Sequence, residues 1–324
     1  MIDTKSKLRS NIWKYYLYEI FAGMFFSIPI IVLFWQNNGL SLTEVMVLQS
    51  IFAIIVVALE IPTGYFADIY GRKQALVLSA ISAFVAISAY SLGHNFYQFL
   101  IAEIFFAISV SFASGTSSAF IYDTLVDLKE EQNYKRIWGN TLFVGMIALA
   151  VSNILGGFIA KIDLRYALYA SIPFFALLIP TALSMYEPQR HKLIFEKGYL
   201  KELFKIIGVA LIKNEKLRWL IVYSGVVYAF NQSALWLYQP YFKLSGLDIT
   251  YFGLVFASFQ VVAAISSKYA HKLEEKLGQK YSLAMLILLV SGSYFLMSNF
   301  VFLFSFSFSF LHQFVRGFKS AVVT

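Results

Sequence analysis

Residues 60–73 read EIPTGYFADIYGRK and lie at the end of a long apolar run. Gly64 precedes Asp68 by one helical turn, so a bare patch of backbone and a carboxylate share one face of the predicted helix. Gly71 permits a tight reversal of the chain directly afterwards. The stretch therefore predicts a helix that ends close to Asp68 and turns sharply into the next one.

Arg72 and Lys73 add two positive charges to this short loop. Such charges favour the cytoplasmic side of a membrane, and Asp68 can pair with Arg72 and accept N–H bonds from a neighbouring helix N-terminus. We therefore expect Gly64, Asp68, Gly71, Arg72 and Lys73 to form a conformational latch. The alternative is a loop that only sets topology, which explains the two cations but not the spacing of Gly64 and Asp68.

The composition indicates a polytopic membrane protein. The 324 residues are 59% hydrophobic and only 14% charged, and the mean hydropathy is +0.68. Soluble domains carry about 25% charged residues, so a soluble globule is excluded. The 33 Phe and 21 Tyr exclude a disordered chain. The sequence has no Cys, which excludes disulfides, thiolate metal sites and a cysteine nucleophile.

Hydropathy predicts ten membrane spans, because about 20 apolar residues in a helix cross the hydrocarbon core. The expected spans are residues 11–35, 43–67, 74–93, 97–122, 138–160, 166–186, 217–240, 249–269, 281–298 and 300–318. With a cytoplasmic N-terminus, 23 of the 26 Lys and Arg fall on the inner side, and only Lys161, Arg165 and Lys243 lie outside. This bias supports the orientation and accounts for the net charge of +8 without nucleic acid.

The chain divides at its longest polar segment. We expect an N-terminal bundle of six spans over residues 1–186, a cytoplasmic linker over 187–216 and a C-terminal bundle of four spans over 217–324. Apolar residues at 200, 203, 204 and 207 predict an amphipathic interfacial helix in the linker. Asp68–Lys73 is echoed by Glu275–Lys280 after the second span of the second half, which predicts a duplicated bundle.

The loop after the second span resembles the signature of the major facilitator superfamily of secondary transporters, which reads G-x-x-x-D-x-x-G-R-K. The E-x-P-T-G prefix at Glu60, Ala102-Glu103, the SGTSSA run at 114–119 and Tyr122-Asp123 resemble a bacterial branch of drug or sugar permeases. The resemblance implies an all-helical fold of two pseudosymmetric halves that work by alternating access. It also implies that Asp123 is a partner of Arg72.

The sequence departs from that family in its second half. Family members have twelve helices, and the loop after the second helix packs against the eleventh, whereas only ten spans are predicted here. We therefore expect an incomplete second half that lacks the last two helices. A truncated remnant that does not transport is an alternative to a working transporter.

Ionisable residues within membrane spans are costly and are functional candidates. Glu19 and Glu60 are each expected roughly 10–12 Å from the inner surface, where they could share a cavity. Glu103 lies nearer the outside, and Arg316 lies toward the inner end of the tenth span. A buried carboxylate can carry a proton, so we expect proton or substrate handling from these four residues. Glu19 could instead snorkel to the interface, and Arg316 could bond helix carbonyls.

Polar residues at the middle of the seventh span are the candidates for a substrate cavity. Asn231 and Gln232 are the two, with interhelical hydrogen bonding as the alternative. Nearby aromatics fit an interfacial belt. The sequence contains no phosphate-binding glycine loop, and the four His have no metal-ligand spacing, so no metal site and no enzyme activity are expected.

These features together predict a secondary transporter that exports a small organic molecule, a drug or a metabolite, against a proton gradient. Proton-coupled uptake of a sugar or another solute is the alternative. The acidic spans suit a cationic or neutral cargo. We expect no cofactor besides the proton gradient, and no partner besides the substrate and the lipid bilayer. The expected form is a monomer in the bacterial plasma membrane.

Overall fold

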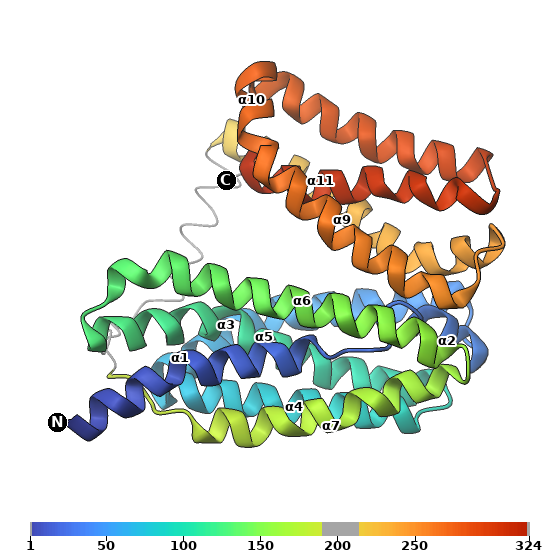
Figure 1. The fold of residues 1–324 in the computed structure, drawn as a ribbon. Coiled ribbons are helices and arrows are strands. Elements are labelled where there is room, and N and C mark those ends of the chain that lie inside the picture. Colours follow the sequence, from blue (N-terminus) through green and yellow to red (C-terminus); the bar gives the residue numbers. More distant parts are fainter. Residues whose placement is uncertain (1, 190–213, 323–324) are drawn as a thin grey trace. The chain divides into compact units, whose positions relative to one another are not determined.

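A computed structural model describes residues 2–189 and 214–322, and these residues form helices joined by short turns, with no strand among them (Figure 1). Seven helices of the described chain are long and apolar enough to cross a membrane. The amphipathic helix expected in the linker lies outside the described residues. The chain forms two compact units, which are described separately below.

Residues 2–189 of the first unit form seven α-helices and the short 3-10 segment η1 (Glu131–Asn133). The helices are α1 (Ile2–Gly23), α2 (Ile31–Asn37), α3 (Leu42–Tyr70), α4 (Arg72–Leu92), α5 (Phe96–Leu128), α6 (Tyr134–Ala160) and α7 (Leu164–Ser184). Side-chain caps set several of their starts. Ser41 and Glu44 form a capping box on α3, and the side chain of Asn95 accepts a hydrogen bond from the Gln98 backbone N–H at the start of α5.

The first expected span is broken in the structure. Helix α1 ends at Gly23, and α2 begins only at Ile31. Pro29 lies in the intervening turn, where its missing N–H cannot continue a helical hydrogen-bond ladder. The turn is held by Ser171 of α7, whose hydroxyl accepts the Phe26 backbone N–H at 3.1 Å. The sequence run over 11–35 is apolar throughout, so hydropathy alone did not show this break.

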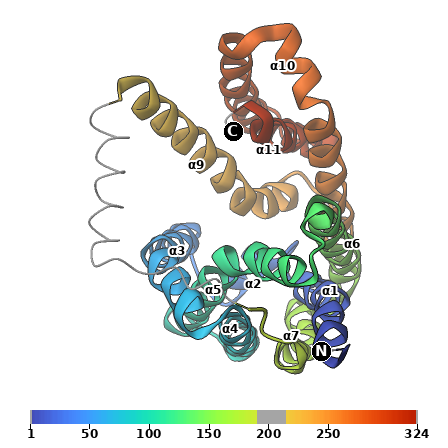
Figure 2. The same cartoon turned by 90° about the vertical axis from the view of Figure 1, so that its left-hand side faces the viewer.

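Helix α4 packs mainly against α5 and α7 of the first unit. It also packs against α3, while α1 packs against α6 and α7. Figure 2 shows these helices nearly end-on, with α4 between α5 and α7. The buried face of α4 is a stripe of small residues that includes Ala75, Ser79, Ala83 and Ala86. Small side chains let membrane helices approach closely, and the Ser79 hydroxyl donates to the Ser109 carbonyl oxygen of α5 at 2.9 Å.

The described residues of the second unit, which start at Asn214, form three helical segments and a short 3-10 segment. They are α9 (Glu215–Leu244), α10 (Ile249–Asn299), η3 (Leu303–Phe308) and α11 (Ser309–Val322), and the first turns of α10, Ile249–Leu254, cluster with the first unit. The segment labelled α10 contains two helices that meet at Gly278, whose φ of +74° and ψ of +160° are not helical. The two expected spans, 249–269 and 281–298, therefore lie in separate helices on either side of this turn.

The two units repeat the same turns at a constant spacing. Residues 39–43 read GLSLT and residues 246–250 read GLDIT, 207 positions later. Gly39 and Gly246 have φ values of +89° and +82°, and Gly71 and Gly278, which are also 207 positions apart, have +127° and +74°. The α3–α4 hairpin and α10 are therefore counterparts, and the two halves are pseudosymmetric.

Candidate functional site: a loop network and buried carboxylates

The turn between α3 and α4 is built around Gly71. Its N–H donates to the Ala67 carbonyl oxygen at 3.1 Å and closes α3, and its φ of +127° starts α4 at the next residue. A Cβ atom placed on Gly71 would lie 2.8 Å from the Glu187 carboxylate and 2.4 Å from the Gln74 side chain. The backbone conformation therefore favours glycine here, and a side chain would also displace the ends of the Glu187 and Gln74 side chains.

Arg72 joins three helices at this turn. Its guanidinium lies 2.9 Å from Asp68 Oδ1 of α3 and 3.4 Å from Asp123 Oδ2 of α5. The three side chains are 19–24% exposed, so their charges are only partly screened by solvent. The structure thus brings Asp68, Arg72 and Asp123 together. Lys73 contributes its backbone to the turn, and an added Cβ at Gly64 would meet open space in the described structure.

Glu187 completes this network and was not among the residues expected from the sequence. One of its carboxylate oxygens accepts the Arg72 N–H and the other accepts the Lys73 N–H, each at 2.8 Å. The carboxylate therefore caps the positive N-terminal end of α4. Glu187 follows α7 directly, so the loop between α3 and α4 is fastened to the chain segment that leaves the first bundle.

The chain segment that follows α7 also forms hydrogen bonds with α1 and α5. Asn11 of α1 donates to the Tyr186 carbonyl oxygen and accepts the Tyr186 N–H, both at 2.8 Å. The Lys14 ammonium donates to the Ser184 carbonyl oxygen at 2.6 Å. The Gln189 N–H donates to Asp127 Oδ2 of α5 at 2.6 Å. The start of the linker is therefore bound to α1, α4 and α5 together.

Glu103 is a buried carboxylate inside the first bundle. Only 4% of the residue is exposed on α5. The Gln49 amide of α3 donates to its Oε1 atom, and the Tyr90 hydroxyl of α4 bonds the same carboxylate. Burial disfavours the negative charge, whereas these two polar partners favour it. The carboxylate is therefore held inside the bundle by two neutral hydrogen-bond partners from α3 and α4.

Glu19 and Glu60 lie in different environments. Glu19 is partly buried on α1, where its Oε1 atom accepts the Tyr15 hydroxyl at 2.7 Å. Its Oε2 atom lies close to Gly145 of α6. Glu60 is exposed on α3. The contacts described for the two residues do not join them, so the shared cavity expected for Glu19 and Glu60 stays a prediction.

The candidates of the second unit bridge helices. Arg316 of α11 donates to Gln260 Oε1 of α10 at 2.5 Å, and the Asn231 amide of α9 donates to the His312 carbonyl oxygen at 2.9 Å. Gln232 is exposed on α9. The Asn231 bond is the interhelical kind given as its alternative, whereas Arg316 bonds a side-chain amide and not the helix carbonyls of its alternative; the roles of both residues stay predictions.

The chain also resembles known proteins in sequence and fold. It is 21% identical over 306 residues to an uncharacterised MFS-type transporter of Methanocaldococcus jannaschii, an alignment that covers 92% of this chain and 77% of that one. Its fold matches a crystal structure of the nucleoside transporter NupG with a TM-score of 0.80 at 14% identity, over 98% of this chain and 80% of that one. A D-xylose–proton symporter matches with a TM-score of 0.61 at 17% identity, over 99% and 80%.

A comparison of the sequence with protein-family models identifies the family. The model of the Major Facilitator Superfamily matches residues 18–323, which is nearly the whole chain. This match agrees with the helical fold, the internal repeat and the signature loop described above. The chain therefore belongs to the Major Facilitator Superfamily of membrane transporters.

Proposed function

We propose that this transporter couples the export of a small organic solute to proton entry. The observation that carries the proposal is Glu103, a carboxylate that is 4% exposed within a membrane bundle. A charge at this depth is costly, so an intramembrane carboxylate is retained where it binds an ion, a proton or a substrate. Its partners Gln49 and Tyr90 are neutral, which leaves proton exchange as the way to remove the charge.

The loop network supplies the conformational part of the proposed mechanism. Arg72 bridges carboxylates on α3 and α5, and Glu187 ties the same turn to the end of α7. In the proposed mechanism, the ion pairs of Arg72 and the hydrogen bonds of Glu187 are formed in one access state and broken in the other. We propose that they hold one of the two access states and open during transport.

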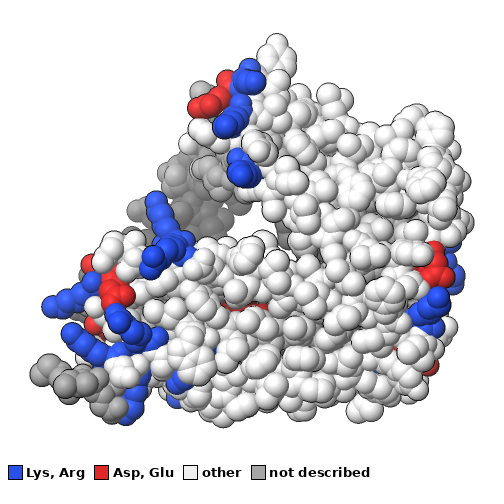
Figure 3. All heavy atoms as spheres, in the orientation of Figure 1, with Lys and Arg blue, Asp and Glu red and all other residues white. Residues whose placement is uncertain are grey.

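Charge distribution supports the proposed orientation. In Figure 3, the Lys and Arg of the first unit that are visible on this face gather mainly at one end of the bundle, near the N-terminus. The helix flanks are almost free of charge on this face. We propose that this end is cytoplasmic, in a plasma membrane, because Lys and Arg favour that side. The proposed working form is one copy of the chain without a cofactor.

Uptake is the second candidate direction. It is favoured by the fold match to a D-xylose–proton symporter. A carboxylate such as Glu103 serves proton entry equally in symport and antiport, so the direction depends on which face binds the solute.

Proton flux in everted membrane vesicles tests the proposal. After the lumen is acidified, a panel of nucleosides, pentoses and lipophilic cations is added, and luminal pH is followed with a fluorescent dye. We expect at least one compound to release protons, as antiport requires. Glu103→Gln should abolish this release, whereas Glu131→Gln, which removes an exposed carboxylate after α5, should retain it. Unchanged release in Glu103→Gln would exclude the proposed proton carrier.

A further inference from the structure

The connection that follows the end of α10 consists of large apolar residues. Residues 300–304 read FVFLF, and all five are between 45% and 67% exposed. Five consecutive exposed apolar residues are unusual on a surface that contacts water. The sequence has no Asp, Glu, Lys or Arg between Lys280 and Arg316, so the connection also lacks the charges that are typical of an aqueous loop.

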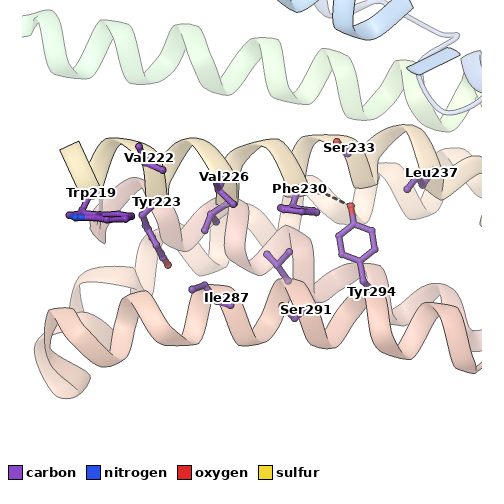
Figure 4. Close-up of a pocket in the computed structure, with 12 residues that line it drawn as sticks. Trp219, Val222, Tyr223, Val226, Phe230, Ser233, Leu237, Ile287, Ser291 and Tyr294 are labelled. Carbon is purple, nitrogen blue, oxygen red and sulfur yellow. Dashed lines mark hydrogen bonds between the residues drawn. The ribbon is translucent and has the colours of Figure 1, made fainter. Parts of the chain in front are cut away.

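Hydrogen bonds to α9 fix the position of this connection. The Tyr241 hydroxyl of α9 donates to the Phe300 carbonyl oxygen at 2.9 Å. Shortly before the connection, the Tyr294 hydroxyl of α10 donates to the Phe230 carbonyl oxygen of α9 at 2.7 Å (Figure 4). The last turns of α10 and the residue that follows them are therefore both bonded to α9.

The backbone polar groups of Phe300 and Phe302 are bonded within the second unit. The Phe300 N–H donates to the Leu296 carbonyl oxygen at 2.9 Å, and its carbonyl oxygen accepts the Tyr241 hydroxyl. The Phe302 N–H donates to Ser305 Oγ at 3.3 Å, and its carbonyl oxygen accepts the Ser305 N–H at 2.9 Å. Unpaired backbone groups are a main reason why turns stay in water, so these bonds lower the cost of placing the connection against lipid.

The internal repeat identifies the counterpart of this connection in the first unit. Helix α4 ends at Leu92 and α5 begins at Phe96; exactly 207 positions later, α10 ends at Asn299 and η3 begins at Leu303. The residues between the two elements are GHN at 93–95 in the first unit and FVF at 300–302 in the second. Polar or small residues thus stand where the second unit has large apolar ones.

The counterpart positions are exposed in the first unit, although α7 packs against α4 there. His94 and Asn95 are exposed, and Tyr97, the counterpart of Phe304, is 75% exposed. Helix packing therefore leaves these positions uncovered in the first unit, and the repeat indicates that residues 301–304 likewise face the surroundings of the protein. Polar side chains suit water at such positions, whereas large apolar side chains suit lipid.

We propose that residues 300–304 form a lipid anchor, which lies in the bilayer leaflet at the end of the second unit opposite the Gly278 turn. Aromatic side chains favour the boundary between lipid headgroups and acyl chains, and irregular backbone exposed to lipid is excluded from the hydrocarbon core. The anchor therefore lies at this boundary, with its phenylalanine rings among the acyl chains. The first-unit connection, which contains His94 and Asn95, contacts water instead.

Spin-label accessibility in liposomes tests the anchor. Because the sequence has no Cys, Val301→Cys and its counterpart His94→Cys each provide a single labelling site. The full chain is labelled and reconstituted, and collisions of the label with oxygen, which dissolves in lipid, are compared with collisions with a water-soluble nickel chelate. We expect the ratio of oxygen to nickel collisions to be severalfold higher at position 301 than at position 94. Phe304→Cys should give the same high ratio as Val301→Cys.

Two results would overturn the proposal. Ratios at 301 and 304 as low as the ratio at 94 would mean that the connection lies in water. Few collisions with either reagent at 301 and 304 would mean that protein covers the segment. The measurement does not require solute transport, so its outcome is independent of the proposed proton coupling.

Discussion

Gly71 has a backbone conformation that other residues adopt only with strain. Its φ is +127°, and an added Cβ would collide with the Glu187 carboxylate and the Gln74 side chain. We expect Gly71→Ala to lower the free energy of unfolding by about 1–3 kcal/mol, which combines the cost of positive φ with displacement of the cap. The thermal midpoint of the purified protein in mild detergent measures this loss.

Gly139→Ala is the matched control. Gly139 lies inside α6, and a Cβ there meets open space. Because Ala is the better helix former, this change should raise the free energy of unfolding by up to about 1 kcal/mol. Equal midpoints for the two variants would show that the turn tolerates a side chain and would contradict the geometry at Gly71.

Glu187 should stabilise the first turn of α4 through its charge. In Glu187→Gln the amide keeps the size but lacks the carboxylate that accepts the Arg72 and Lys73 N–H groups. We expect a loss of about 1 kcal/mol and faster hydrogen exchange at these two amides. Glu130→Gln, which removes a partly buried partner of Arg9, should leave that exchange unchanged. Slow exchange in both variants would rule out the cap.

Some residues of the α3–α4 loop network could be predicted from the sequence, and others could not. Gly64, Asp68, Gly71 and Arg72 were readable because helix and turn spacing are local. Glu187 lies 115 positions from Arg72, and nothing in its own neighbourhood indicates a helix cap. The degree of burial of Glu103 was likewise not readable, since it depends on α3 and α4 as much as on α5.

At the scale of elements, Arg165 at the start of α7 binds the α4–α5 and α2–α3 connections at one end of the first unit. Its guanidinium donates to the carbonyl oxygens of Ser91 at 2.6 Å and Gly93 at 2.9 Å, and to Asn38 Oδ1 at 2.8 Å. We expect Arg165→Lys to cost about 1–3 kcal/mol of stability, because an ammonium on a flexible stem cannot serve these acceptors in fork geometry. Thermal unfolding in detergent measures the cost.

Lys161→Arg provides the comparison for this prediction. Lys161 is an exposed cation at the same end of α6, and the exchange keeps its charge. It should change the free energy of unfolding by less than about 0.5 kcal/mol, as surface substitutions usually do. A similarly small effect for Arg165→Lys would mean that these connections are held by packing alone.

Hydropathy predicted where the helices lie along the chain, but it did not predict where a helix is interrupted. The apolar run over 11–35 contains a break between Gly23 and Ile31, since Pro29 interrupts backbone bonding while hydropathy stays high. The eighth and ninth expected spans lie in the two helical parts of α10, which meet at the non-helical Gly278. The tenth expected span is a 3-10 segment followed by the 14 residues of α11. Single residues such as Pro29 and Gly278 set where these helices end. A hydropathy value is an average over about 20 residues, so it does not register them.

At the scale of the whole molecule, the duplicated turn motif was a correct indication of two related halves. The match of Asp68–Lys73 with Glu275–Lys280 is short, but the same spacing of 207 residues relates Gly39 to Gly246 and Gly71 to Gly278, with positive φ at each. The halves differ in charge at this turn, because Gln279 stands where the first half has Arg72. The three-helix ion network is therefore a property of the first half.

Breaking that network should shift the balance between access states. In Asp123→Asn, Arg72 keeps Asp68 and loses its charged partner on α5. A partly exposed ion pair contributes about 1 kcal/mol, which corresponds to a roughly fivefold change in the ratio of two states. Because the sequence contains no Cys, two cysteines for spin labels can be introduced at Lys129 and Lys268, both exposed, without removing native thiols. We expect the two populations of the inter-label distance to change by that factor. Glu131→Gln should leave the distribution as it is, and an unaltered distribution in Asp123→Asn would show that the network stabilises the first bundle without governing access.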